Sequence, residues 1–224
     1  MDTIEERVAL PGGEVDLIRP RDAEALLTEE AFADEEFLPY WAELWTSGIA
    51  LAHDVSRRSL RGARTVELGC GLALPSIAAA RSGGRVLATD WSTDAVEAAR
   101  ANAEKNHAQI ETAVCDWARP APLLARAPFD LVLASDVLYE ARNGLMLLRL
   151  LPLLVNPTVR CSGDRRSRCA PPQGGRILIA DPGRAAAEEF IASARDRFDV
   201  DTIMSPRCAH VVIHRLRLRS ASPR

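Results

Sequence analysis

Four acidic side chains lie at or near the ends of predicted strands, where α/β proteins bind ligands: Glu67, Asp90, Asp116 and Asp136. The first two bracket the stretch ELGCGLALPSIAAARSGGRVLATD, in which Gly69 and Gly71 form a Gly-x-Gly turn. Glycine has no Cβ, so such a turn is tight and lets the backbone approach a ligand. An acid at the end of the next strand can accept hydrogen bonds from both hydroxyls of a ribose. This unit predicts a site for an adenosine-bearing ligand.

The spacing around the glycines excludes two common nucleotide sites. A dinucleotide fingerprint needs Gly or Ala where this chain has Leu74, and a P-loop needs Gly-Lys-Ser/Thr, which is absent. The turn instead resembles motif I of the class I S-adenosylmethionine-dependent methyltransferases, E/D-x-G-x-G-x-G, with Ala73 in place of the third glycine. The alternative is a structural turn that binds no ligand, because short glycine motifs recur by chance.

Two Asp-Trp pairs follow successive predicted strands. Asp90 would bind the ribose, while Trp91 either lies along the adenine or packs between helix and sheet. Asp116 could accept a hydrogen bond from the adenine amino group, with Trp117 as an aromatic wall beside it. The alternative for Asp116 is an ordinary turn acid.

The tetrapeptide Asp136-Val137-Leu138-Tyr139 follows the strand predicted at 129–135. Its acid and its phenol are three residues apart, so both could converge on one incoming amine. The alternative is that Asp136 caps the following helix and Tyr139 is buried in the core.

An aromatic segment, Pro39-Tyr40-Trp41-Ala42-Glu43-Leu44-Trp45, precedes the first predicted core strand. It could merely pack an N-terminal helix, since helical spacing runs from Trp41 onward. It could also form a roof over the site, because aromatic faces attract a cationic sulfonium through cation–π interaction.

Composition indicates one soluble α/β domain. The chain has 224 residues, is 47% hydrophobic and carries a net charge of −3, so no strong field draws it to nucleic acid or a membrane. No apolar run could span a membrane and the N-terminus lacks signal-peptide character, so we expect a cytoplasmic protein. The five cysteines form no CxxC pair and are expected to be reduced thiols, with no metal site.

Strand and helix patterns alternate along most of the chain, which predicts a doubly wound, seven-stranded, mostly parallel sheet. A hairpin is predicted around Pro11-Gly12-Gly13, and a short helix at 22–32. Residues 1–60 are interpreted as an extension that packs on the core and roofs the site. Residues 61–224 are the core, with a flexible insert at 156–175. The remaining predicted strands are 64–69, 85–90, 110–115, 129–135, 176–180, 199–204 and 209–217, and the helices are 74–82, 93–106, 141–154 and 185–196.

Together these segments resemble the lysine methyltransferase family (methyltransferase family 16, nicotinamide N-methyltransferase-like) over roughly residues 36–217. The resemblance is carried by PYWAELWTSGIALA, ELGCGLALPSIAAA, VLATDW, DVLY and ILIADPGR. The PYW-x-x-x-W and ADPGR segments resemble most the branch that methylates lysines of the electron transfer flavoprotein beta subunit. Ala73 and the insert at 156–175 depart from the family pattern.

The resemblance implies a protein-lysine N-methyltransferase that uses S-adenosylmethionine and releases S-adenosylhomocysteine. Its acceptor would be a lysine of a protein, such as the flavoprotein beta subunit or a ribosomal protein. A small-molecule N-methyltransferase and an inactive cofactor-binding scaffold remain alternatives. Glu67 would brace the glycine loop or reach the cofactor's ammonium, unless it is a simple strand-end acid. The implied catalytic residues are Asp136 and Tyr139, and the implied cofactor-binding residues are Trp45, Glu67, Gly69, Gly71, Asp90, Trp91, Asp116, Trp117 and Ser135.

Overall fold

The computed structural model describes residues 2–23, 26, 39–157 and 174–220. Most of the helix predicted at 22–32 and most of the insert at 156–175 lie outside the described residues, as do Cys161 and Cys169. Among the helices of the described ranges, none is long and apolar enough to cross a membrane.

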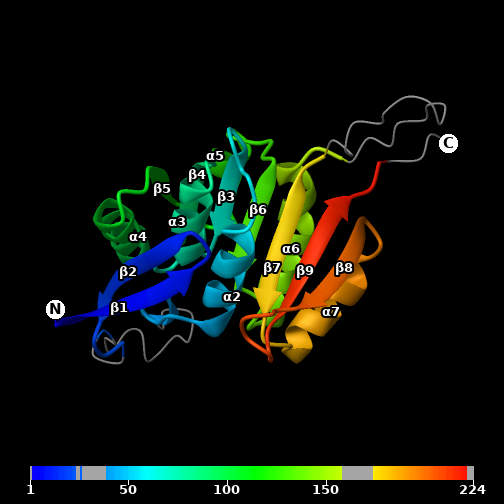
Figure 1. Ribbon diagram of the computed structural model, residues 1–224. Coiled ribbons are helices and arrows are strands. Elements are labelled where there is room, and N and C mark those ends of the chain that lie inside the picture. The colour runs from blue at the N-terminus through cyan, green and yellow to red at the C-terminus, as the bar shows by residue number, and fades with distance from the viewer. Residues whose placement is uncertain (1, 24–25, 27–38, 158–173, 221–224) are drawn as a thin grey trace.

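One seven-stranded sheet forms the centre of the molecule (Figure 1). The first five strands in its order are parallel, and β9 runs antiparallel to both β7 and β8. This confirms the predicted doubly wound, mostly parallel architecture. The spatial order is β5 (Ile110–Val114), β4 (Arg85–Asp90), β3 (Arg64–Leu68), β6 (Leu131–Ser135), β7 (Arg176–Asp181), β9 (Val212–Leu218) and β8 (Phe198–Met204).

The central parallel strands are buried because helices cover both faces of the sheet. β6 and β7 are near-continuous apolar runs, as strands covered on both sides should be. One core cluster packs α5 (Ala121–Leu124), α6 (Ala141–Leu154) and α7 (Ala185–Ala194) on one face. A second cluster packs α2 (Thr46–Val55), α3 (Leu74–Arg81) and α4 (Thr93–Lys105) on the other (Figure 1).

The predicted N-terminal hairpin is confirmed as β1 (Thr3–Leu10) and β2 (Gly13–Pro20), and α4 holds it in place. The side chain of Asn102 accepts a hydrogen bond from the Ile18 amide at 2.7 Å and donates to the Ile18 carbonyl at 3.1 Å. One turn later, Asn106 makes the same pair of bonds with Asp16, at 3.0 and 2.7 Å. The two asparagines therefore take the place of a neighbouring strand along the outer edge of β2.

The prediction of a continuous helix from Trp41 is wrong. Residues Tyr40–Ala42 form a single 3-10 turn, η3, and the chain is extended at Glu43 and Trp45 before α2 begins at Thr46. The Tyr40 carbonyl accepts from the Trp45 indole at 2.8 Å and from the Glu43 amide at 3.5 Å. The short helix α5 was not predicted, because only four residues form it.

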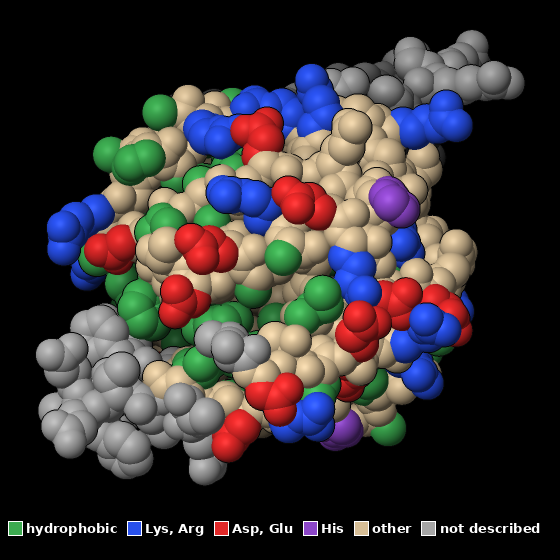
Figure 2. Space-filling view, turned by 90° about the vertical axis from the view of Figure 1, so that its left-hand side faces the viewer, with side chains coloured by type: hydrophobic (Ala, Val, Ile, Leu, Met, Phe, Trp, Pro, Cys, Tyr) green, Lys and Arg blue, Asp and Glu red, His purple; other side chains and the backbone are tan. Residues whose placement is uncertain are grey.

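The space-filling view shows acidic and basic side chains interspersed over one face of the molecule (Figure 2). The mixture on this face agrees with the small net charge of −3. It is the pattern of a protein surface without a large field of one sign.

Asn102→Ala should weaken the attachment of the hairpin. The variant leaves the Ile18 amide and carbonyl without their partners, and unpaired groups of this kind destabilise a protein by about 1–3 kcal/mol. The free energy of unfolding in urea measures the loss. Glu97→Ala, on the exposed face of the same helix, is the matched control and should change stability by less than about 0.5 kcal/mol. Equal effects of the two substitutions would contradict the role given to Asn102.

Candidate active site

A cavity of about 630 Å³ opens at the carboxyl edge of the sheet, beyond β3, β4, β5 and β6. Its volume lies within the range of small-molecule sites, about 300–1,000 Å³. Of the eleven predicted site residues, Glu67 alone does not line it. The ten that do are Trp45, Gly69, Gly71, Asp90, Trp91, Asp116, Trp117, Ser135, Asp136 and Tyr139.

The glycine loop needs its glycines for two reasons. Gly69 and Gly71 have φ of 66° and 47°, in the left-handed region that side chains disfavour. A Cβ on Gly69 would lie 3.0 Å from Val137 Cγ1, and one on Gly71 would lie 3.2 Å from the Trp41 carbonyl oxygen. Ala73, in place of the third motif glycine, also adopts a left-handed φ of 62°, just before α3. The loop therefore keeps its backbone shape despite the substitution.

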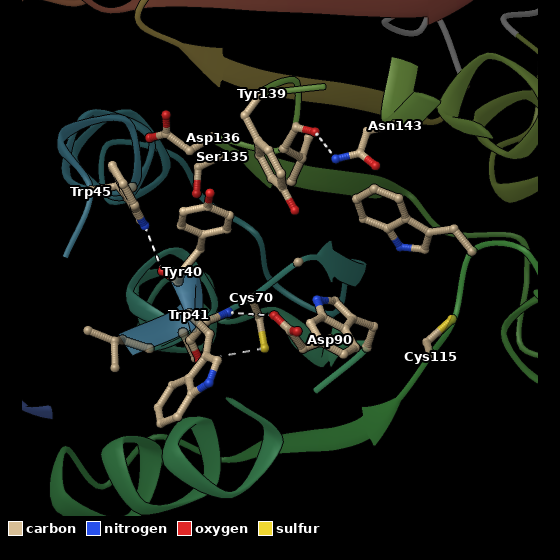
Figure 3. Close-up of a pocket in the computed structure, with 18 of the residues that line it drawn as sticks. Tyr40, Trp41, Trp45, Cys70, Asp90, Cys115, Ser135, Asp136, Tyr139 and Asn143 are labelled. Atoms are coloured by element: carbon tan, nitrogen blue, oxygen red, sulfur yellow. Dashed lines mark hydrogen bonds between the residues drawn. The ribbon is translucent and has the colours of Figure 1, made fainter. Parts of the chain in front are cut away.

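Asp90 fastens this loop from the end of the neighbouring strand. Its carboxylate accepts a hydrogen bond from the Gly71 amide at 3.0 Å (Figure 3) and another from the Ser92 amide at 3.1 Å. Burial raises the pKa of Asp90, and the bonds from Gly71 and Ser92 oppose the rise. A carboxylate offers about four acceptor positions, so it can also bind hydroxyls in the cavity.

Glu67 lies beneath the loop instead of in the cavity. Its side chain is fully buried, and one carboxylate oxygen accepts bonds from the Ser76 amide at 2.8 Å and hydroxyl at 2.5 Å. The other oxygen has no hydrogen-bond partner among the described residues. Burial raises the pKa of Glu67 to about 8, so it is largely protonated at neutral pH. These contacts hold the start of α3, the helix that follows the glycine loop.

Aromatic rings from distant parts of the chain meet at the cavity. The ring centroids of Tyr40 and Tyr139 lie 5.3 Å apart, and those of Tyr40 and Trp45 lie 6.4 Å apart. Figure 3 shows Tyr40 between Trp45 and Tyr139. Each of the three residues is about 40% exposed, so none is simply core packing. Burial raises the pKa of the Tyr139 phenol, which therefore stays protonated and can donate a hydrogen bond.

The two Asp-Trp pairs line the cavity from the ends of β4 and β5. Trp91 is 44% exposed, so it does not pack between helix and sheet. Trp117 packs partly against the core and also stands next to Gly69. Asp116 accepts a hydrogen bond from the Ala118 amide at 2.8 Å, a contact typical of a turn acid. Asp116 also lines the cavity.

Asp136 has an unusual backbone and a charged partner. Its φ is 56°, and its amide donates to the Ala180 carbonyl at 3.0 Å. Its carboxylate pairs with Arg184 Nη1 at 2.6 Å. The alternative interpretation of this segment is wrong on both counts, because Glu140 is the N-cap of α6 and Tyr139 is partly exposed. Ser135, just before Asp136, lies against Gly48 of α2.

Several cavity residues were not predicted. The cavity is also lined by Cys70, between the two glycines, by Cys115, just before Asp116, and by Arg142, Asn143 and Met146 of α6. Asn143 donates to the Val137 carbonyl at 3.1 Å and so holds the loop that carries Asp136 and Tyr139. Its position, seven residues after Asp136 in an amphipathic helix, gave no signal by itself. Within the described residues, no group of three or more His, Cys, Asp or Glu side chains is placed to hold a metal ion.

Solved structures share this fold. The 16S rRNA methyltransferase of T. Thermophilus, in complex with AdoMet and guanosine, matches with a TM-score of 0.65 at 13% identity. The match covers 97% of this chain and 50% of that one. At this identity the likeness shows the fold alone. That fold, with a glycine loop and an acid at the next strand end, is the class I methyltransferase architecture.

The sequence narrows the class to one family. The profile described as lysine methyltransferase matches residues 37–170, and the chain belongs to that family. It is 35% identical over 152 residues to the electron transfer flavoprotein beta subunit lysine methyltransferase of Xenopus laevis, covering 66% of this chain. It spans only 54% of that relative's length. It is also 32% identical to the human histone-arginine methyltransferase METTL23, over 57% of this chain and 71% of the relative.

The buried carboxyl of Glu67 should make stability depend on pH. Its pKa is about 8 in the folded protein but about 4.3 in an unfolded chain, so between these values the folded state holds a proton that the unfolded state has lost. The free energy of unfolding must therefore fall as pH rises through this window. Relative to Glu67→Gln, which cannot ionise, the wild type should lose about 1 kcal/mol per pH unit. Urea unfolding of both proteins from about pH 5 to 8 measures this; parallel curves would contradict it.

Proposed function

We propose that this chain is an S-adenosylmethionine-dependent N-methyltransferase whose acceptor is a lysine side chain of a protein. The observation that carries the proposal is the position of Asp136 and Tyr139. They line the same cavity as the glycine loop and Asp90, with the ring of Tyr40 against Tyr139. A nucleoside end and an amine-binding end thus share one cavity, in a chain of the lysine methyltransferase family.

The residues of the cavity fit the proposed cofactor. Asp90 would hold the ribose, and Trp91, Asp116 and Trp117 would surround the adenine. The amides of the glycine loop, at the start of α3, suit a carboxylate such as the methionine end. A Cβ on Gly69 or Gly71 would crowd Val137 or Trp41, so the loop has no room for larger residues. When bound, S-adenosylmethionine supplies an electrophilic methyl group on a sulfonium.

The chain's own work is to bind, orient and desolvate the acceptor. A free lysine has a pKa of about 10.4, and only its neutral form has the lone pair that attacks a methyl group. Aromatic walls remove water from the amine, and burial favours the neutral form. Tyr139 can donate to or accept from the nitrogen, and Asp136 can orient it. Water at the open mouth can accept the proton.

The two relatives favour a protein acceptor over a small molecule, because each is named for a protein substrate. They differ in the methylated side chain, lysine in one and arginine in the other. Lysine is favoured here by the family profile. The flavoprotein beta subunit is the first acceptor to try, because the Xenopus relative is named for it.

Labelling separates these acceptors. The purified chain is incubated with methyl-labelled S-adenosylmethionine and either a cell lysate or the recombinant flavoprotein beta subunit. We expect a labelled protein band that yields methyl-lysine on hydrolysis. Asp136→Asn should reduce transfer at least about 100-fold, because the orienting carboxylate is lost while Asn still tolerates a left-handed backbone. Asp196→Asn, an exposed acid after α7, is the control and should label normally.

Other outcomes of this experiment point elsewhere. Label found only in small molecules would identify a small-molecule N-methyltransferase. Methyl-arginine in the hydrolysate would show that the acceptor is arginine and not lysine. Cofactor binding without any transfer would indicate an inactive scaffold. Self-labelling does not complicate the result, because Lys105 is the only lysine and pairs with Glu5 at 3.0 Å.

Asp90→Ala should weaken cofactor binding, because Asp90 both holds the Gly71 amide and faces the proposed ribose site. Two hydroxyl bonds to a carboxylate contribute about 1.5–3 kcal/mol each, so we expect the dissociation constant to rise at least about tenfold. Calorimetry with S-adenosylhomocysteine measures it. Asp136→Asn should bind this ligand with nearly unchanged affinity. Unchanged binding in Asp90→Ala would contradict the ribose assignment.

A further inference from the structure

The carboxylate of Asp136 is held by a guanidinium from another part of the chain. Arg184 Nη1 lies 2.6 Å from Asp136 Oδ1 and 3.1 Å from Asp181 Oδ2. Asp136 is 9% exposed and Asp181 is fully buried, whereas the Arg184 side chain is 31% exposed, so both carboxylates are withdrawn from water and the guanidinium is partly open to it. Asp136 precedes Arg184 by 48 residues, and β6 and β7 bring them together as neighbouring parallel strands.

The turn after β7 is built to present Arg184. One oxygen of Asp181 accepts hydrogen bonds from the amides of Gly183, at 2.7 Å, and Arg184, at 2.8 Å. Gly183 has a φ of 86°, which favours glycine and reverses the chain. Arg184 is then the N-cap residue of α7. The sequence Asp181-Pro182-Gly183-Arg184 therefore fixes the backbone at Arg184, and the ion pairs with Asp136 and Asp181 direct its guanidinium.

Asp136 needs such a support. A left-handed φ of 56° costs about 1 kcal/mol or more at a residue other than glycine and persists only when surrounding contacts impose it. The hydrogen bond from the Asp136 amide to the Ala180 carbonyl holds the backbone, and the ion pair with Arg184 holds the side chain. Without the guanidinium, the carboxylate could turn to other rotamers.

The charge of Asp136 also matters for an amine. An unpaired carboxylate near an amine raises the amine's pKa and so favours the protonated, unreactive form. A cation beside the carboxylate offsets that effect. Asp181 also pairs with Arg184, and His214 of β9 is acted on by the charges of Asp181 and Arg195. The charges of Glu140, Asp90 and Arg142 act on Tyr139.

We propose that Arg184 is a positioning residue for the acceptor site: it fixes the Asp136 carboxylate and offsets its charge, so that Asp136 orients the acceptor nitrogen without holding a proton on it. Arg184 is absent from the cavity wall, where Asp136 is present, so it acts through Asp136. The inference rests on the proposed function, because it assumes that the acceptor is an amine.

The pH dependence of transfer tests the charge effect. Arg184→Gln should move the rise of kcat, measured at saturating acceptor, to higher pH, because kcat reports the pKa of the bound amine. The acceptor is the protein labelled in the lysate or the flavoprotein beta subunit. At pH 7 the variant should transfer methyl groups about tenfold more slowly than wild type. The difference should close to within about twofold near pH 9.5. Arg184→Lys keeps the charge and should recover most of the activity at pH 7.

Two controls separate this role from a general structural one. Arg195→Gln removes an exposed cation at the other end of α7 and should leave the profile unchanged. The affinity of Arg184→Gln for S-adenosylhomocysteine should equal that of wild type. A loss of activity by the same factor at every pH, or no loss at all, would overturn the charge effect.

A second measurement needs no turnover. In protein labelled with ¹⁵N-arginine, the ion pair should give one slowly exchanging guanidinium signal that disappears in both Arg184→Lys and Asp136→Asn. If no such signal is found, or if it survives in Asp136→Asn, the pairing is wrong whatever the activity. If wild type transfers no methyl group but the signal behaves as expected, the proposed function fails while the support of Asp136 by Arg184 stands.

Discussion

The site depends on one hydrogen bond between neighbouring strand ends, from the Gly71 amide to the Asp90 carboxylate at 3.0 Å. β3 and β4 are parallel and in register, so the loop after one strand lies beside the acid that ends the other. The bond holds the glycine loop open toward the cavity, and it orients a buried carboxylate. Below the loop, Glu67 fixes the start of α3 through Ser76. Two acids therefore support this region: Asp90 binds the loop and lines the cavity, and Glu67 binds the start of α3 outside the cavity.

Much of the fold followed from local patterns in the sequence. The strand Arg85–Asp90 and the helix Ala141–Leu154 were predicted to the residue, because each is a regular pattern with clear ends. The helix expected from Trp41 failed because apolar spacing continues through Glu43, where no Gly or Pro marks the break. Two contacts that the pattern does not show accompany the turn: the Trp45 indole donates to the Tyr40 carbonyl, and the Trp41 carbonyl lies against Gly71.

The candidate site was also predictable where local sequence patterns specify it. Asp90, Asp116 and Asp136 follow apolar runs, and parallel strands bring such ends to one edge. Glu67 looked equivalent in sequence but points beneath the loop, because side chains alternate along a strand and its place in that alternation faces α3. In the sequence, Arg184 stands out only as the last residue of ILIADPGR. Its ion pair with Asp136 depends on β7 lying next to β6, which no local pattern specifies.

The two halves of the cavity are constructed differently, and this bears on how such a fold can serve different acceptors. The proposed cofactor half comes from consecutive β-α units, so its geometry is set by the sheet itself. The proposed acceptor half is assembled from η3, the loop after β6 and the turn after β7, through the contacts of Tyr40 with Tyr139 and of Arg184 with Asp136. None of these three segments contributes an atom to the bond between Gly71 and Asp90, although Trp41 of η3 and Val137 of the loop after β6 pack against the glycine loop. The acceptor half is therefore where relatives that methylate different side chains should differ most, and identity in the glycine loop alone says little about the acceptor.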